Sequence, residues 1–228
     1  MQPRNLLVRL VLQSGVWLVI MGALLFLGAG RMDWPQGWAF LLVFALLCAA
    51  FGVVTIKRNP RLLEVRLDGL SQPGQPLWDK FFTGFFVLTW LAWLALMAAD
   101  AQRWHPAQMP PALNVLGAVI VVLGFGVTAR VLLENSFAAP VVRVQGGQHV
   151  VDTGPYAVVR HPMYATALLF LAGMPLLLGS WLGFIGVALI FLGMASRSVA
   201  EENLLRRELP GYAGYMQRVR YRLIPYIW

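Results

Sequence analysis

Four long apolar stretches dominate this sequence. They run roughly from Val8 to Gly30, from Gly37 to Ile56, from Phe81 to Ala99 and from Ala112 to Leu133. A helix needs about 20 apolar residues to cross the hydrocarbon core of a bilayer. Only 12% of the chain is charged and 59% is apolar, whereas roughly 25% of a soluble domain is charged. The sequence therefore predicts an all-α, polytopic integral membrane protein.

A fifth apolar region, from Tyr164 to Met194, is too long for one span. It is interrupted by Gly179 and Ser180, with Pro175 just before them, and Gly and Pro are residues that end or bend helices. We interpret the region as a helical hairpin of two short spans. The whole chain is then expected to hold about five to six transmembrane helices and to end in this C-terminal hairpin.

The basic residues predict the orientation of the spans. In a six-span topology only Arg31 and Arg103 fall on one side, and the other Lys and Arg residues lie in the N-terminal tail, in 57–80, in 130–160 or in the tail after 196. Cytoplasmic loops carry the excess of basic residues, so both termini are expected in the cytoplasm, with the chain in a bacterial inner membrane. Because the net charge of +8 is spread between spans, it indicates membrane lipids rather than nucleic acid as partners.

The chain divides into two expected regions. Residues 1–134 would form the N-terminal transmembrane helices, with an amphipathic interfacial segment at 57–80, and residues 135–228 would form a C-terminal region that contains the hairpin. Cys48 is the only cysteine, so an internal disulfide and a Cys-based zinc site are excluded. No metal is expected as a partner.

Ionisable side chains flank the hairpin on both sides. The segment 154–164 precedes it and the segment 197–202 follows it. If the hairpin folds back on itself, His161 and Tyr164 come close to Arg197 and Glu201 in one cytoplasmic pocket. Arg197 and Glu201 are four residues apart and share a helix face. Taken singly, these residues also fit simpler roles as membrane-edge anchors, interfacial aromatics, solvated charges or helix caps.

The joint pattern is similar to that of a known enzyme family. Its parts are Arg160-His161-Pro162-Met163-Tyr164, the apolar hairpin, Glu201-Glu202, and the tail segments Leu209-Pro210-Gly211-Tyr212 and Tyr221-Arg222-Leu223-Ile224-Pro225. This arrangement resembles the isoprenylcysteine carboxyl methyltransferases, and phospholipid N-methyltransferases carry a related version. The likeness extends from about Gln148 to the C-terminus.

The resemblance implies that residues 135–228 form a methyltransferase region with a cytoplasmic pocket for S-adenosyl-L-methionine. Its expected lining residues are Gln148, His149, Val150, Val151, Tyr156, His161, Pro162, Met163, Tyr164, Glu201 and Glu202. A sulfonium cation is stabilised by carboxylates and aromatic faces. Arg197 falls where the family places a substrate-contacting arginine, and the expected catalytic residues are Arg197, Glu201 and His161.

The expected methyl acceptor is a lipophilic small molecule or a prenylated substrate that arrives from the bilayer. A carboxylate acceptor held by Arg197 is already ionised at neutral pH and needs no base. A lipid amine or a small thiol would need a base, for which Glu201 and His161 are candidates.

Two other functions compete with methyl transfer. The ending Tyr221-Arg222-Leu223-Ile224-Pro225-Tyr226 also resembles NADPH-dependent membrane reductases of sterols and enones, although their additional Arg/Asp-rich stretch is missing here. A transporter or scaffold is disfavoured because the first four spans contain few polar residues. The second His-Pro pair, in Arg103-Trp104-His105-Pro106, is interpreted as a loop turn on the opposite face.

Overall fold

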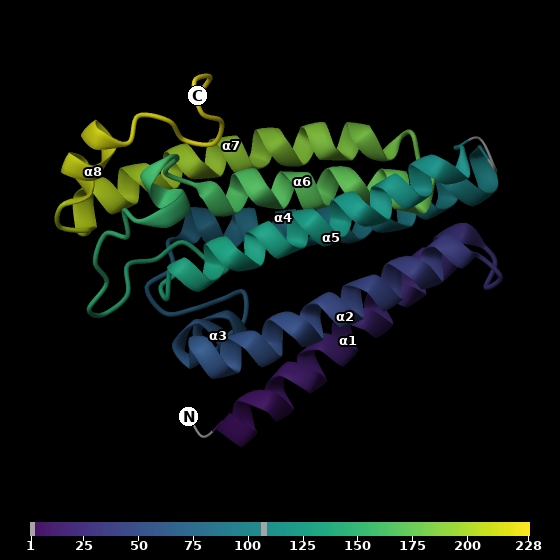
Figure 1. Ribbon diagram of the computed structural model, residues 1–228, viewed down its shortest axis with the longest axis horizontal. Coiled ribbons are helices and arrows are strands. Elements are labelled where there is room, and N and C mark those ends of the chain that lie inside the picture. The colour runs from purple at the N-terminus through teal and green to yellow at the C-terminus, as the bar shows by residue number, and fades with distance from the viewer. Residues whose placement is uncertain (1–2, 106–108) are drawn as a thin grey trace.

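The computed structural model describes residues 3–105 and 109–228, and these residues fold into helices without a strand (Figure 1). The α-helices are α1 (Pro3–Ala29), α2 (Pro35–Arg58), α3 (Pro60–Leu67), α4 (Leu77–Ala99), α5 (Pro111–Glu134), α6 (Pro162–Leu178), α7 (Gly183–Glu208) and α8 (Tyr212–Arg218). A short π-helix, η1 (Asp100–Trp104), follows α4, and a 3₁₀ turn, η2 (Gly154–Ala157), precedes α6. The predicted all-α class is confirmed.

The predicted spans are confirmed as helices. In the described part of the chain, α1, α2, α4 with η1, α5 and α7 are long and apolar enough to cross a membrane, and α6 is a shorter apolar helix of 17 residues. The predicted hairpin consists of α6 and α7, and it turns at Gly179, whose φ of 82° is left-handed. Glycine adopts that conformation without a side-chain clash. The six helices run back and forth, so that α3 and α8 lie at the same end of the bundle (Figure 1).

Glycines bring α5 and α6 into close contact. A Cβ atom at Gly117 or Gly124 would collide with the backbone of α6, and one at Gly173 would collide with the backbone of α5. Small residues at helix interfaces allow this approach within a membrane, where packing rather than the hydrophobic effect drives association. The end of α5 and the start of α6 are therefore held side by side, and the loop between them projects from one end of the bundle.

Helix α3 supplies the amphipathic element predicted within 57–80. Asn59 caps it by accepting a hydrogen bond from the N–H of Leu62, which satisfies one of the free donors at a helix start. Its apolar residues Leu63 and Leu67 pack on Leu6 of α1. The helix is thereby attached to the α1–α2 pair, at the end of the bundle that carries the polar loops (Figure 1).

The opposite end of the hairpin is closed by a buried carboxylate. Asp100 Oδ2 accepts hydrogen bonds from Ser180 Oγ at 2.6 Å and from the N–H of Leu182 at 3.1 Å. His105 Nδ1 lies 2.6 Å from Asp100 Oδ1. The second His-Pro pair thus contributes its histidine to a turn contact, while Pro106 lies outside the described residues. We call Asp100, His105 and Ser180 the hairpin-tip cluster.

Candidate functional site

The two motifs that flank the hairpin meet through Glu202. Its carboxylate accepts a hydrogen bond from Arg160 Nε at 2.6 Å and another from Arg222 Nε at 2.9 Å. His161 Nε2 lies 3.2 Å from the same carboxylate. The Glu202 side chain is only 2% exposed, and a buried charge is tolerated when it is both paired and hydrogen-bonded. Glu202 therefore joins α7 to the start of α6 and to the C-terminal tail.

The tail is fixed to the same motif by backbone contacts. Arg160 Nη1 donates to the carbonyl oxygens of Val219 and Arg220, both at 2.7 Å. The backbone N–H groups of Arg160 and His161 donate to the carbonyls of Tyr221 and Arg222. The Tyr221–Pro225 segment, which forms part of the family resemblance, thus closes the base of the hairpin.

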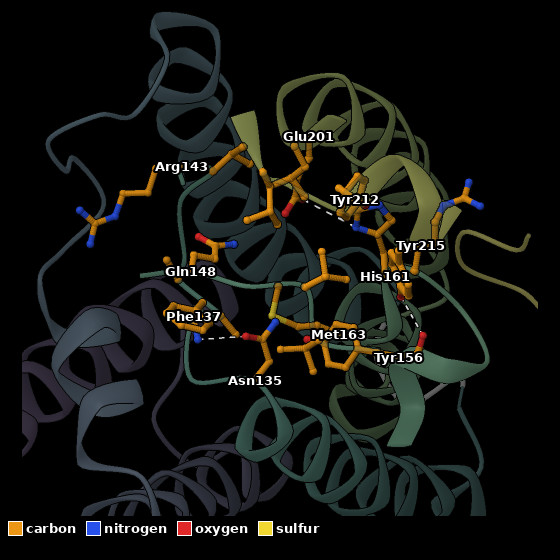
Figure 2. Close-up of a pocket in the computed structure, with 18 of the residues that line it drawn as sticks. Asn135, Phe137, Arg143, Gln148, Tyr156, His161, Met163, Glu201, Tyr212 and Tyr215 are labelled. Atoms are coloured by element: carbon orange, nitrogen blue, oxygen red, sulfur yellow. Dashed lines mark hydrogen bonds and ion pairs between the residues drawn. The ribbon is translucent and has the colours of Figure 1, made fainter. Parts of the chain in front are cut away.

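Glu201 has a different environment from its neighbour. Its carboxylate accepts a hydrogen bond from Tyr164 Oη at 2.7 Å and lies 3.8 Å from His161 Nδ1. The rings of His161 and Tyr164 are parallel, with centroids 5.4 Å apart. The Glu201 side chain is 23% exposed, and Figure 2 shows it facing His161 across the pocket. In the described part of the chain no arginine forms an ion pair with the Glu201 carboxylate, and Arg197 lines the same pocket and interacts with it electrostatically.

The pocket brings together most of the residues predicted from the sequence. The predicted residues that line it are Gln148, His149, Val150, Val151, Tyr156, His161, Met163, Tyr164, Arg197 and Glu201. Pro162 and Glu202 do not line it. Pro162 begins α6 as its first residue, a position where the missing N–H costs nothing, and Glu202 is enclosed by its basic partners.

A polar loop covers the pocket. Residues Phe137, Ala138 and Gln148 of the loop between α5 and η2 line one wall, and Figure 2 places Phe137 and Gln148 opposite His161 and Tyr215. The enclosed interior measures about 90 Å³, less than the roughly 300–1,000 Å³ typical of small-molecule sites. A ligand of nucleoside size would therefore require the pocket to widen.

Arg197 lines the pocket while pairing with a residue that the sequence analysis did not select. Its Nε donates to Asp79 Oδ1 at 3.0 Å, and its Nη2 donates to the carbonyl of Pro140 at 3.0 Å. Asp79 is fully buried and also accepts from Gln75 Nε2 and from the N–H of Val142, both at 2.8 Å. Arg197 thus connects α7 with the start of α4 and with the covering loop.

Three tyrosines of the pocket stay neutral. Burial raises the pKa of Tyr156 to about 12, and burial also raises the pKa values of Tyr212 and Tyr215 well above the ordinary value. Tyr215 Oη donates to the carbonyl of Tyr156 at 2.7 Å. These rings provide apolar and aromatic surface, and their hydroxyls act as hydrogen-bonding groups rather than bases.

Several pocket residues were missed by the sequence analysis, although some had a signal. Leu205 and Leu209 line the pocket and follow Glu201 at intervals of four, the spacing of one helix face. Asp79 is an acidic residue at the start of an apolar span, which is a costly position that suggests a partner. The loop residues Asn135, Phe137 and Val141 carry no comparable pattern.

The residues present suit S-adenosyl-L-methionine. Glu201 offers a carboxylate and Tyr164 an aromatic ring, the groups that stabilise an onium cation, and the loop wall adds apolar and amide side chains for a nucleoside. Among the described residues, no group of three His, Cys, Asp or Glu side chains is placed to hold a metal ion.

The comparison with protein families agrees with this arrangement. Residues 113–210 match the family model of the phospholipid methyltransferases. A search of curated protein sequences returned no match. The matched segment begins inside α5 and ends after α7, so it contains the hairpin, the covering loop, Glu201 and Glu202. The narrower likeness to the isoprenylcysteine enzymes stays a prediction. Residues 113–210, which build most of the pocket, are therefore similar to the phospholipid methyltransferases, and they lie within a multi-pass membrane protein.

Proposed function

We propose that this protein is an S-adenosyl-L-methionine-dependent methyltransferase that acts on a lipophilic acceptor from the bilayer. The observation that carries the proposal is the Glu201 carboxylate, which faces a pocket at the base of the hairpin together with Tyr164 and His161. The match of residues 113–210 to the phospholipid methyltransferases supports the same reaction class.

The donor side of the pocket is formed by α6, α7 and the covering loop. When bound, S-adenosyl-L-methionine supplies a methyl group attached to a cationic sulfur. Glu201 and the rings of Tyr164 and Tyr156 would stabilise that positive charge, and Gln148 with the residues after it would hold the nucleoside part. The covering loop would shield the bound donor from water, which strengthens electrostatic interactions inside the pocket.

We propose a carboxylate as the accepting group, as in the isoprenylcysteine enzymes. A carboxylate is ionised at neutral pH, so no side chain has to remove a proton. Arg197 places a positive charge in the pocket wall and would orient this group. Because Asp79 partly neutralises Arg197, its attraction for a second anion is weaker than that of an isolated guanidinium.

A lipid amine is the second candidate acceptor, and the family match favours it. An ammonium group must lose a proton before it can accept a methyl group. His161 lies within reach of both Glu201 and Glu202 and is the proposed base in that case.

Ligand binding to the purified protein tests the donor assignment. Isothermal titration should show binding of S-adenosylhomocysteine and no binding of NADPH. Binding of NADPH alone would support the reductase interpretation and overturn the proposal. If neither ligand binds, the proposal is also contradicted.

Product chemistry separates the two acceptor classes. The protein is incubated with a methyl-tritiated donor and a membrane lipid extract, and the labelled lipid is then treated with mild alkali. A methyl ester releases volatile tritiated methanol, whereas an N-methyl group stays in a non-volatile product. Label that stays non-volatile after alkali would replace the carboxylate by the amine.

A further inference from the structure

Arg66 of α3 is a basic side chain that the proposed reaction does not yet use. Its Nη1 donates to the carbonyl of Ala138 at 3.3 Å, a long hydrogen bond. Within residues 3–105 and 109–228, no acidic side chain forms an ion pair with it. By contrast, Arg160 and Arg197 each have a carboxylate partner. Arg66 is thus a half-buried cation with its charge uncompensated.

An apolar cavity opens beside Arg66. Its volume is about 350 Å³, within the roughly 300–1,000 Å³ of sites for small molecules. Helices α1, α2, α3, α5 and α6 supply the walls. The lining residues other than Arg66 are Leu10, Gln13, Ser14, Trp17, Phe44, Cys48, Phe51, Leu63, Leu67, Phe125, Thr128, Ala129, Leu132, Ala167 and Phe170. A cavity with mostly apolar walls and a single cationic side chain among its lining residues suits an amphiphile.

Residues that pack together connect the wall of this cavity with the wall of the pocket that would hold the methyl donor, which we call the donor pocket. Leu132, a wall residue of the cavity, packs in one cluster with Ala138 and Met163, which line the donor pocket. Arg66 bonds to the carbonyl of Ala138, and its charge is close enough to lower the pKa of Tyr156, against the larger effect of burial. A head group at Arg66 would therefore lie next to the site of the methyl donor.

We propose that Arg66 binds the anionic group of a single-chain lipid whose tail occupies this cavity. This inference rests on the proposed function and names a specificity-determining residue for its acceptor. The planar guanidinium matches the paired oxygens of a carboxylate or a phosphate. The proposal concerns binding, and it leaves the orientation of the accepting group to the pocket around Arg197 and Glu201.

The partial burial of the Arg66 guanidinium is consistent with a role in binding an anion. The removal of water around its guanidinium lowers the pKa of Arg66 from its ordinary value, yet an arginine keeps its charge at neutral pH. A partly desolvated cation attracts an anion more strongly than an exposed one does. An anionic ligand would supply the compensating charge that the described part of the chain does not supply.

The test measures lipid binding apart from methyl transfer. The full chain is placed in nanodiscs of phosphatidylcholine, and radiolabelled palmitate, 1-palmitoyl lysophosphatidate and hexadecanol are titrated in parallel. The two anions distinguish a carboxylate from a phosphate, and the alcohol reports the tail alone. We expect at least one anion to bind about tenfold or more tightly than hexadecanol, since a hydrogen bond to a charged partner contributes that much.

Three variants locate the binding. Arg66→Gln should lose the preference for the anion, while Ala129→Phe, which fills the cavity, should weaken binding of all three probes. Arg61→Gln is the matched control, because Arg61 lies on the same helix and contacts the loop at Gly146 and Phe137 instead. It should bind the probes as the parent does. Unchanged anion preference in Arg66→Gln, or equal affinity of the parent for hexadecanol and both anions, would overturn the proposal.

Binding of S-adenosylhomocysteine is measured on the same samples. Arg66→Gln should bind it with parental affinity, because Arg66 does not line the donor pocket. If the parent fails to bind S-adenosylhomocysteine but shows the anion preference, the methyltransferase proposal fails and the lipid site stands. If the parent binds S-adenosylhomocysteine but shows no anion preference, only the lipid site fails.

Discussion

The two ends of the α6–α7 hairpin each contain a buried carboxylate, and they differ in what lies beside it. At the tip, Asp100 is surrounded by Ser180, His105 and the N–H of Leu182. At the base, Glu202 is held by Arg160, His161 and Arg222. The difference lies in the residue that precedes Glu202 at the base, because Glu201 lines a pocket and keeps acceptor capacity for a ligand.

This comparison shows how to interpret ionisable residues among membrane helices. Such residues are functional candidates by default, because their burial is costly. Asp100 and Glu202 instead connect helix ends, because their carboxylate oxygens accept hydrogen bonds from other parts of the protein. Glu201, at 23% side-chain exposure, has the available oxygen and the adjacent space that a ligand site requires. A fully buried carboxylate therefore indicates a structural contact between helix ends. A carboxylate that lines a pocket and has a free acceptor position indicates a site that can bind a ligand.

The largest effect on stability is expected from Glu202→Gln. This change leaves the buried side chain of Arg160 and the partly exposed side chain of Arg222 near one another without a compensating charge. Removal of one partner from a buried ion pair costs about 3–5 kcal/mol. Thermal unfolding in detergent, followed by tryptophan fluorescence, should show a large fall in the midpoint. Glu208→Gln, on an exposed face of the same helix, is the control and should leave the midpoint unchanged.

An intermediate effect is expected from Asp100→Asn at the hairpin tip. The amide keeps one acceptor oxygen but removes the charge that Ser180 and His105 contact, and a hydrogen bond to a charged group contributes about 1.5–3 kcal/mol. The midpoint should fall by less than in Glu202→Gln. Affinity for S-adenosylhomocysteine, measured by titration well below the midpoint, should match that of the parent.

The matched control for the tip is Asp33→Asn, at an exposed ion pair with Arg31 near the same end of the bundle. It should leave both readouts as in the parent. Clearly weaker binding of S-adenosylhomocysteine by Asp100→Asn than by the parent would contradict the view that the hairpin tip joins helices while the hairpin base binds the ligand.

Local sequence patterns were sufficient to predict the spans and many of the residues that line the pocket. Apolar length predicted the long helices, and Gly179 with Pro175 predicted the hairpin turn. The Arg160–Tyr164 motif and Glu201 could be placed together because a hairpin must return to the membrane face where it began. The family resemblance added the loop segment from Gln148 to Val151, which lines the pocket.

Pairings between distant helices could not be read from the sequence. The Asp79–Arg197 contact joins residues 118 positions apart, and it depends on how α4, α7 and the covering loop pack. The choice between Glu201 and Glu202 depends on the rotation of α7, because adjacent residues of a helix point about 100° apart. Which glutamate faces the pocket and which one meets Arg160 is therefore fixed by tertiary packing.

The smallest effect on stability, and the most selective effect on ligand binding, is expected from Glu201→Gln. Glutamine keeps an acceptor oxygen for Tyr164, so the free energy of unfolding should change by less than about 1 kcal/mol. The carboxylate charge is what favours a cationic ligand. We therefore expect binding of sinefungin, which carries an ammonium group in place of the methylated sulfur, to weaken about tenfold.

The comparison ligand makes this prediction specific to charge. S-adenosylhomocysteine has the same nucleoside and amino-acid parts but a neutral sulfur, so its affinity for Glu201→Gln should stay within about twofold of the parental value, much less than the tenfold expected for a lost charge-assisted hydrogen bond. If the variant binds both ligands equally more weakly, Glu201 has a structural role in the pocket, as Glu202 has at the hairpin base. The two glutamates then do not differ in function. If only sinefungin weakens, the negative charge at Glu201 acts on the cationic centre of the donor, and the hairpin base is distinguished from its tip by electrostatics rather than by burial.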